Sequence, residues 1–217
     1  QRRLSKAYLV NNLRKAVYEW RKDDYSGTSN TTKRLLQFWF EEDHLFEKEL
    51  FKFWFCQREA IETLIYVYEV MKKRNFIDMA RDFGSGPIVG YDPSYDQYPL
   101  YAFKMATGSG KTIVMALIIV WSYFNNIKEG GTRYSNNFLI VPPNVIVYER
   151  LARDFRDNKI FYDFPFIPNP WKSLWNLKVT LRDDDSPLAP SGNIILANIQ
   201  QLYESRVDGW TPANIAE

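Results

Sequence analysis

The first 50 residues place apolar side chains at helical spacing. Up to residue 20 the apolar positions recur every three to five residues, with polar side chains between them, at Leu4, Tyr8, Leu13, Val17 and Trp20. This spacing predicts an amphipathic helix. The turn-forming run 25–30 ends it, and Thr31 or Thr32 is expected to cap a second helix. Residues 1–50 are therefore predicted to form a helical N-terminal segment.

A third helix is predicted from Gln57 to about Lys72. Apolar residues again recur at helical spacing, and a Lys-Lys-Arg run suits the C-terminal end of a helix dipole. Residues 82–99 then carry three glycines and three prolines, so they cannot form a regular helix. We interpret residues 82–99 as an insertion before the next strand.

From Leu100 onward, strand-like apolar runs alternate with turns and helical patterns. Each of the first two strands leads through a short turn into a helix, at 112–124 and 145–155. A short helix is also expected from Asn198. The predicted strands are 100–105, 138–141, 177–181 and 193–197. Such alternation predicts an α/β fold, with a parallel sheet and crossover helices.

Composition agrees with a folded, water-soluble chain. Of the 217 residues, 46% are hydrophobic and 25% are charged, as in globular proteins. The longest apolar run, Ile113–Trp121, has nine residues, whereas a membrane-spanning helix needs about 20. We expect a cytoplasmic protein that makes no membrane contact. Because the chain begins at Gln1 rather than Met, we also expect a processed chain or a part of a longer one.

Cysteine and histidine are nearly absent. Cys56 is the only cysteine and His44 is the only histidine in the chain. This composition excludes an intramolecular disulfide and a zinc site built from cysteine and histidine.

Positive charge is concentrated near the N-terminus. Residues 1–34 hold nine Lys and Arg against three acidic residues, a local charge of +6 in a chain whose net charge is +2. This region could bind nucleic-acid phosphates. It could equally be the solvated face of the first helix. The sequence leaves both interpretations open.

The strongest chemical signal is the run Met105–Thr112, MATGSGKT, between an apolar strand pattern and an apolar helix pattern. Gly108 and Gly110 allow a loop whose backbone N–H groups point inward at a polyphosphate. Lys111 is expected to reach the β- and γ-phosphates of ATP, and the Thr112 hydroxyl is expected to hold Mg²⁺. The predicted nucleotide-binding residues of this loop are Thr107, Gly108, Ser109, Gly110, Lys111 and Thr112.

This run resembles motif I of superfamily 2 helicases and translocases of the type III restriction enzyme group, which have methionine where a strict P-loop pattern has glycine. Residues 55–60 are similar to the upstream glutamine motif of that group, 138–144 to motif Ia and 197–202 to motif Ib. The resemblance covers 51–205. It implies that residues 51–217 form an incomplete RecA-like motor domain, a P-loop parallel sheet with flanking helices, behind the helical N-terminal segment.

The resemblance also implies roles for single residues. Gln57 would read adenine, since an amide offers a donor and an acceptor to N6 and N7; alternatively it is a polar residue at a helix N-terminus. The aromatic run 51–55 is expected to lie mostly in the core, with at most one ring on adenine. Motifs Ia and Ib would contact DNA phosphates without sequence preference, or simply cap helices. Their candidate residues are Pro143, Asn144, Asn198, Gln200 and Gln201.

ATP hydrolysis by such machinery needs an acidic pair after an apolar strand. The only downstream candidate is 183–185, which we interpret as a solvated acidic turn rather than a magnesium site. In the resembling motors the acidic motif II follows motif Ib. The chain is therefore expected to stop before motif II, at Glu217, and to hydrolyse no ATP by itself.

The sequence thus predicts the ATP-binding N-terminal part of a helicase or translocase that uses ATP and Mg²⁺ to move along DNA. Modification or nuclease subunits are candidate partners. Two alternatives stay open. One is an unrelated P-loop ATPase or kinase, and the other is a nucleotide-binding or DNA-binding module without turnover.

Overall fold

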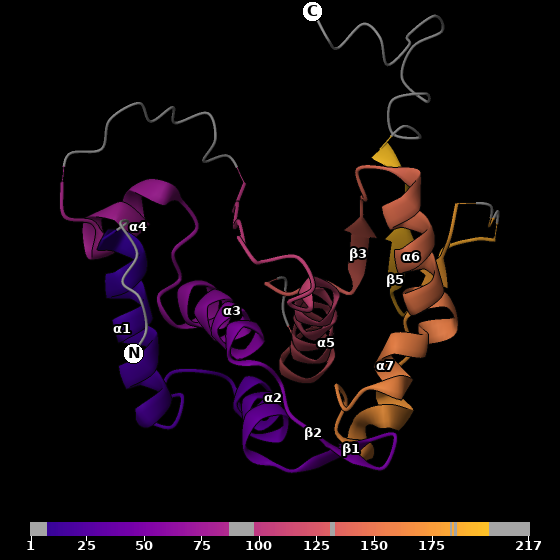
Figure 1. Ribbon diagram of the computed structural model, residues 1–217, viewed down its shortest axis with the longest axis horizontal. Coiled ribbons are helices and arrows are strands. Elements are labelled where there is room, and N and C mark those ends of the chain that lie inside the picture. The colour runs from indigo at the N-terminus through magenta and orange to yellow at the C-terminus, as the bar shows by residue number, and fades with distance from the viewer. Residues whose placement is uncertain (1–7, 87–97, 131–132, 183, 185, 200–217) are drawn as a thin grey trace, which may run out of the picture. The chain divides into compact units, whose positions relative to one another are not determined.

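The computed structural model describes residues 8–86, 98–130, 133–182, 184 and 186–199 (Figure 1). The chain divides into two compact units. The helical unit comprises residues 1–42 and 52–115, and the sheet unit comprises 43–51 and 116–217. The predicted division at residue 50 stays a prediction, because compactness does not show which parts fold independently. No helix in the described ranges has the length and apolar content that crossing a membrane requires.

Helices dominate the helical unit. In chain order its elements are α1 (Tyr8–Lys22), α2 (Asn30–Glu41), α3 (Phe55–Ile65), the π-helical turn η1 (Tyr66–Val70) and α4 (Phe76–Phe83). The helices predicted in this part are confirmed, with the third continuing into η1 at its C-terminal end. Helix α1 buries Leu13, Val17 and Trp20. These residues belong to the face that the apolar spacing predicted, whereas Tyr8, predicted on the same face, is 68% exposed.

The N-terminus of α2 corrects the predicted cap. Ser29 is the N-cap, and its hydroxyl accepts a hydrogen bond from the Thr32 N–H at 3.0 Å. The Thr32 hydroxyl is buried and donates to Glu69 of η1 at 2.7 Å. The prediction of Thr31 or Thr32 as the cap was wrong because a buried carboxylate 37 positions away takes up the Thr32 hydroxyl.

Residues 100–105, predicted as the strand before the glycine-rich loop, form no strand. Their side chains alternate between exposed and half-buried, as in an extended chain, and the Tyr101 hydroxyl donates to the Lys73 carbonyl at 2.8 Å. The described residues of the helical unit include no strand to pair with this segment. Strand pairing needs a hydrogen-bonded neighbour. The alternation therefore predicted the extended backbone correctly and the sheet ladder wrongly.

Residues 44–51 form a β-hairpin in the sheet unit, where a helical segment was predicted. Strand β1 (His44–Phe46) pairs antiparallel with β2 (Glu49–Phe51). Glu47 and Lys48 between them have φ of 50° and 69°, as a type I′ turn requires. That turn is usually marked by asparagine and glycine. The Glu-Lys pair carries no such signal, which is why the hairpin was missed.

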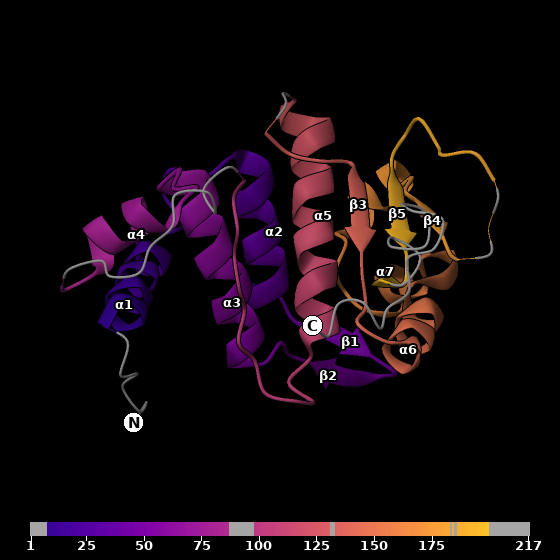
Figure 2. The same ribbon diagram turned by 90° about the horizontal axis from the view of Figure 1, so that it is seen from above.

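A three-stranded parallel sheet forms the centre of the sheet unit (Figure 2). Its strands are β3 (Asn137–Ile140), β4 (Lys178–Thr180) and β5 (Asn193–Leu196), in the order β3-β5-β4. Both views show α5 (Lys111–Glu129), through its sheet-unit residues, on one side of this sheet. They show α6 (Val145–Phe155) and α7 (Lys159–Asp163) on the other side. The predicted parallel α/β arrangement is confirmed for this part of the chain.

The connection from α6 to β4 fills the core with aromatic rings. It includes two 3₁₀ turns, η3 (Arg156–Asn158) and η4 (Asn169–Leu174), on either side of α7. The Trp175 and Phe161 ring centroids lie 4.5 Å apart, and Phe124 of α5 lies 5.0 Å from Trp171. Aromatic contacts of this kind therefore join α5 to the connection and stabilise the sheet unit.

Candidate nucleotide-binding site

A tight loop leads into the first turn of α5, within the helical unit. The Ser109 N–H and hydroxyl both donate to the Ala106 carbonyl, at 3.3 and 2.7 Å. Gly108 and Gly110 have φ of +79° and +80°. This left-handed conformation costs other residues about 1–2 kcal/mol. The two glycines therefore set the path of the loop.

The two glycines differ in their surroundings. A Cβ on Gly110 would lie 2.2 Å from Gln57 Nε2, whereas nothing lies within 4 Å of the corresponding position on Gly108. Glycine at position 110 is therefore needed both for its backbone angle and for the close approach of a side chain. Glycine at position 108 is needed for its angle, and the space beside it is open to a ligand.

Helix α5 begins at Lys111, directly after the loop. The first turn of a helix has backbone N–H groups without helical partners and carries partial positive charge, so it attracts anions. The Lys111 ammonium is exposed and donates to the carbonyls of Ala106 and Met105, at 2.9 and 3.3 Å. Phosphate oxygens can replace these neutral acceptors with stronger, charged ones. Thr112 follows in the same turn and is half-buried.

Gln57 links α3 to the loop. Its side chain is 3% exposed. Its Oε1 accepts a hydrogen bond from the Trp54 N–H at 2.9 Å, and its Nε2 donates to the Ser109 carbonyl at 3.2 Å. These partners determine the amide orientation, because a backbone N–H only donates and a carbonyl only accepts. The Cys56 Sγ lies 3.9 Å from the same carbonyl, so two side chains of one helical turn hold the loop.

A comparison with family models decides the class of protein. The model described as type III restriction enzyme, res subunit, matches residues 51–214 of the 217-residue chain. The chain belongs to this family. It is therefore a helicase-like ATP-binding module of a class that generally uses ATP with Mg²⁺ and acts on DNA. Comparisons with curated proteins and with solved structures gave no match.

In this res-subunit chain, Gln57 was predicted to read adenine or to be a polar residue at a helix N-terminus. Its bond to the Trp54 N–H belongs to the second role, because the third residue of the helix reaches back to the N-cap. One amide N–H and one acceptor lone pair remain for adenine. Both are buried in this arrangement. The adenine role stays a prediction.

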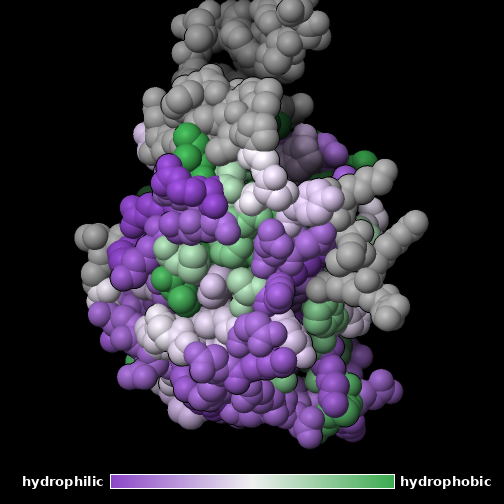
Figure 3. Space-filling view, turned by 90° about the vertical axis from the view of Figure 1, so that its left-hand side faces the viewer, coloured by the Kyte–Doolittle hydropathy of each residue, from purple (hydrophilic) through white to green (hydrophobic). Residues whose placement is uncertain are grey.

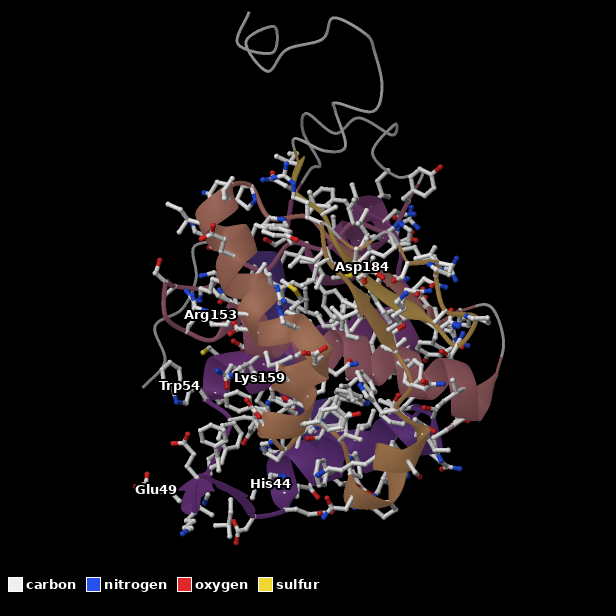
Figure 4. The ribbon with its side chains drawn as sticks, turned by 90° about the vertical axis from the view of Figure 1, so that its right-hand side faces the viewer. His44, Glu49, Trp54, Arg153, Lys159 and Asp184 are labelled. Atoms are coloured by element: carbon white, nitrogen blue, oxygen red, sulfur yellow. The ribbon has the colours of Figure 1, made fainter. Side chains whose placement is uncertain are left out.

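The aromatic residues before Gln57 were expected to lie mostly in the core. Trp54 and Phe55 are instead exposed, at 60% and 52%, and Figure 4 shows the Trp54 ring at the edge of the ribbon. The sequence analysis thus did not single out Trp54, whose N–H bonds the side chain of Gln57. The signal that could have identified it is its place directly before a helix, outside the buried stripe.

The segments predicted as motifs Ia and Ib begin side by side in the sheet unit. Their strands β3 and β5 are parallel neighbours, and the Ala197 N–H donates to the Ile140 carbonyl at 3.0 Å. Pro143 and Asn144 follow β3 and are exposed. The Asn144 Oδ1 accepts from the Val147 N–H at 2.9 Å, which confirms the capping role that the sequence allowed for this residue.

The described residue of the predicted motif Ib is less accessible. Asn198 is 2% exposed and has interactions within the chain, so its amide is not offered to a DNA strand in this arrangement. Gln200 and Gln201 lie outside the described residues. DNA contact by these motif Ia and Ib residues stays a prediction.

The acidic run after β4 behaves as a turn where it is described. Asp184, which is labelled in Figure 4, is exposed. Its carboxylate accepts a hydrogen bond from the Ser186 N–H at 3.0 Å and another from the Ser186 hydroxyl. The hydroxyl bond holds the pKa of Asp184 below its ordinary value. Asp183 and Asp185 lie outside the described residues. Among the residues that are described, no three His, Cys, Asp or Glu side chains converge as metal ligands.

The basic residues near the N-terminus are largely paired with acids. Figure 3 shows a mostly hydrophilic surface on the side of α1 and α4. Arg2, Arg3 and Lys6 lie outside the described residues. The ion pairs in the described part join Arg14 to Glu59, Arg21 to Glu62, Lys22 to Glu19, Lys33 to Asp24 and Arg34 to Glu42. These pairs favour the solvated-face interpretation over a phosphate site.

Proposed function

We propose that this res-subunit chain binds ATP with Mg²⁺ at the loop before α5 and forms the ATP-binding part of a motor that moves along DNA. The observation that carries the proposal is the loop itself. Two glycines with φ near +80° lead into a helix N-terminus that bears Lys111. Inward N–H groups, a helix dipole and an ammonium together suit a polyphosphate. Family membership favours a motor over an unrelated P-loop kinase.

The loop residues have separate roles in this proposal. Backbone N–H groups of 107–110 hold the phosphates, with the Ser109 N–H leaving the Ala106 carbonyl for a phosphate oxygen. The Lys111 ammonium likewise transfers from the loop carbonyls to the β- and γ-phosphates. Thr112 fits a magnesium site because its hydroxyl is an oxygen donor in the first turn of α5. Mg²⁺, when bound, neutralises charge that develops on the phosphates.

Adenine recognition is proposed for Gln57 and Trp54. The amide of Gln57 pairs with N6 and N7 through its remaining N–H and acceptor lone pair, and it keeps its bond to Ser109. The exposed Trp54 ring stacks on the base, since indole offers a large, rigid face. In this scheme Gln57 holds the loop through Ser109 both before and after ATP binds.

The remaining parts of the motor follow from the sheet. Contact with DNA phosphates is proposed at the carboxyl ends of β3 and β5, where open α/β sheets place ligands. Asn144 supports this site, since the helix terminus that it caps carries partial positive charge.

A titration of the chain with a fluorescent ATP analogue and Mg²⁺ tests the proposal. Lys111→Ala should abolish measurable binding, because a point charge for the phosphates is lost. Lys104→Ala is the matched control, since Lys104 is an exposed cation in the segment leading to the loop, and it should bind like the unaltered chain. Equal affinities for all three proteins would refute binding at this loop.

A further inference from the structure

A buried group of charged side chains joins the N-terminal helices to α3 within the helical unit. Glu62 of α3 has 0% exposure. The Arg21 Nε donates to its two oxygens, at 3.0 and 3.1 Å, and the Arg58 Nε donates to Oε1 at 2.8 Å. The Tyr25 hydroxyl donates to the same oxygen at 2.8 Å and accepts from the Arg58 Nη2 at 2.8 Å. These four residues are called the Glu62 cluster.

The bonds of the Glu62 cluster define geometry more than they add stability. Burial raises the pKa of Tyr25, and the Glu62 carboxylate raises it further, so the hydroxyl stays protonated and donates. Replacing buried ion pairs by apolar residues is often neutral or stabilising, because desolvation of the charges offsets their attraction. Each hydrogen bond nevertheless has a required direction. The Glu62 cluster therefore holds its elements in one arrangement.

Arg58 carries this arrangement to the nucleotide-binding loop. Its guanidinium lies 4.9 Å from the ring centroid of Phe40 in α2, in addition to its bonds to Tyr25 and Glu62. Its own N–H closes the first turn of α3 by donating to the Trp54 carbonyl at 3.1 Å. Gln57, one position earlier in that turn, is the residue that donates to Ser109. Holding Arg58 therefore holds the turn that presents Gln57 to the loop.

We propose that Tyr25 and Arg58 are positioning residues of the nucleotide-binding loop. They keep the first turn of α3 in the orientation in which Gln57 bonds Ser109. The proposal rests on the proposed ATP binding at this loop. When the turn moves, a smaller fraction of molecules has the loop in its binding conformation, and the apparent ATP affinity falls in proportion to that fraction.

The chain contains its own reporter for this movement. Cys56 is the only cysteine, and its Sγ lies in the same turn of α3, 3.9 Å from the Ser109 carbonyl. Cys56 is half-buried, so movement of this turn away from the loop exposes the thiol further. The rate at which a small thiol reagent labels Cys56 therefore measures the separation directly, and it needs no nucleotide.

Two variants remove hydrogen bonds from the Glu62 cluster but keep most of each side chain. Tyr25→Phe removes one hydroxyl and keeps the ring, which packs 5.0 Å from Trp20. Arg58→Lys keeps the charge but cannot bond Glu62 and Tyr25 together in the same geometry. Both quantities are measured well below the unfolding temperature. In each variant, Cys56 should be labelled faster, and the ATP analogue with Mg²⁺ should bind about three- to tenfold more weakly.

Lys33→Gln is the matched control, because it breaks the exposed pair with Asp24 in the same unit. It should change neither the labelling rate of Cys56 nor the affinity for the ATP analogue. The proposal is overturned if Tyr25→Phe and Arg58→Lys lower the thermal midpoint but leave labelling and ATP affinity unchanged. It is also overturned if labelling rises without weaker binding in a chain that binds ATP, or if Lys33→Gln has equal effects.

Failure of the proposed function gives a different pattern. An unaltered chain that binds no ATP analogue contradicts nucleotide binding itself. The labelling rates still decide the positioning role in that case. Faster labelling in Tyr25→Phe and Arg58→Lys, but not in Lys33→Gln, supports it, and unchanged rates overturn it.

Discussion

Alanine at position 110 should destabilise the helical unit more than alanine at position 108. Both glycines have φ close to +80°, so both substitutions cost the same backbone strain, about 1–2 kcal/mol. Both also reduce the entropy of the unfolded chain equally. Only at Gly110 would the new Cβ meet the Gln57 Nε2, at 2.2 Å. The two variants are therefore a matched test of this close contact.

The size of the difference follows from the bonds of Gln57. The amide can avoid a Cβ on residue 110 only by moving, and movement breaks its bonds to the Trp54 N–H and the Ser109 carbonyl. Each bond contributes about 1 kcal/mol net, and forced overpacking typically costs about 1–3 kcal/mol. We expect Gly110→Ala to lower the free energy of unfolding by about 2 kcal/mol more than Gly108→Ala does.

Urea denaturation of the chain, followed by tryptophan fluorescence, measures both free energies of unfolding. Repeating the measurement in the Gln57→Ala background isolates the contact. Without the Gln57 side chain, the cost of Gly110→Ala should fall to that of Gly108→Ala. Equal costs in the original background, or an excess that persists without Gln57, would refute the reasoning.

Four further predictions concern single side chains. Lys111→Ala should change the free energy of unfolding by less than about 0.5 kcal/mol in urea denaturation, because the exposed ammonium adds little to packing. Gln57→Ala should weaken ATP more than GTP by about 1–3 kcal/mol in a direct titration, since only adenine presents N6 beside N7; equal losses would leave its structural role alone. Trp54→Ala should weaken both nucleotides alike, by about 1–3 kcal/mol, because stacking accepts any base, and a loss confined to ATP would contradict this. The pKa of Tyr25 is raised above its ordinary value of 10.0, so its contribution to stability is complete below that pH and is lost as pH rises; Tyr25→Phe should therefore reduce the alkaline fall of the thermal midpoint, and parallel curves would argue against it.

Periodicity along single segments determined the local elements of this chain. Helix α6 and strands β3 and β5 lie within one residue of their predicted bounds, because the spacing of apolar residues decides which face a segment can bury. The glycine-rich loop was predictable for a related reason. Glycine tolerates φ near +80° without strain, and the Lys-Thr pair that follows carries charge and a hydroxyl into the next helix.

Tertiary structure alone decided which groups those elements meet. Gln57 bonds Ser109 across 52 positions, and Trp54 is exposed although its aromatic neighbourhood favoured the core. Residues 100–105 are extended but form no strand. The Glu62 cluster likewise draws its members from separate elements. A hydrogen-bond partner or a neighbouring strand is a property of two segments and of the chain path that brings them together. Sequence spacing describes one segment at a time, so the chemistry of the loop was predictable and its supporting contacts were not.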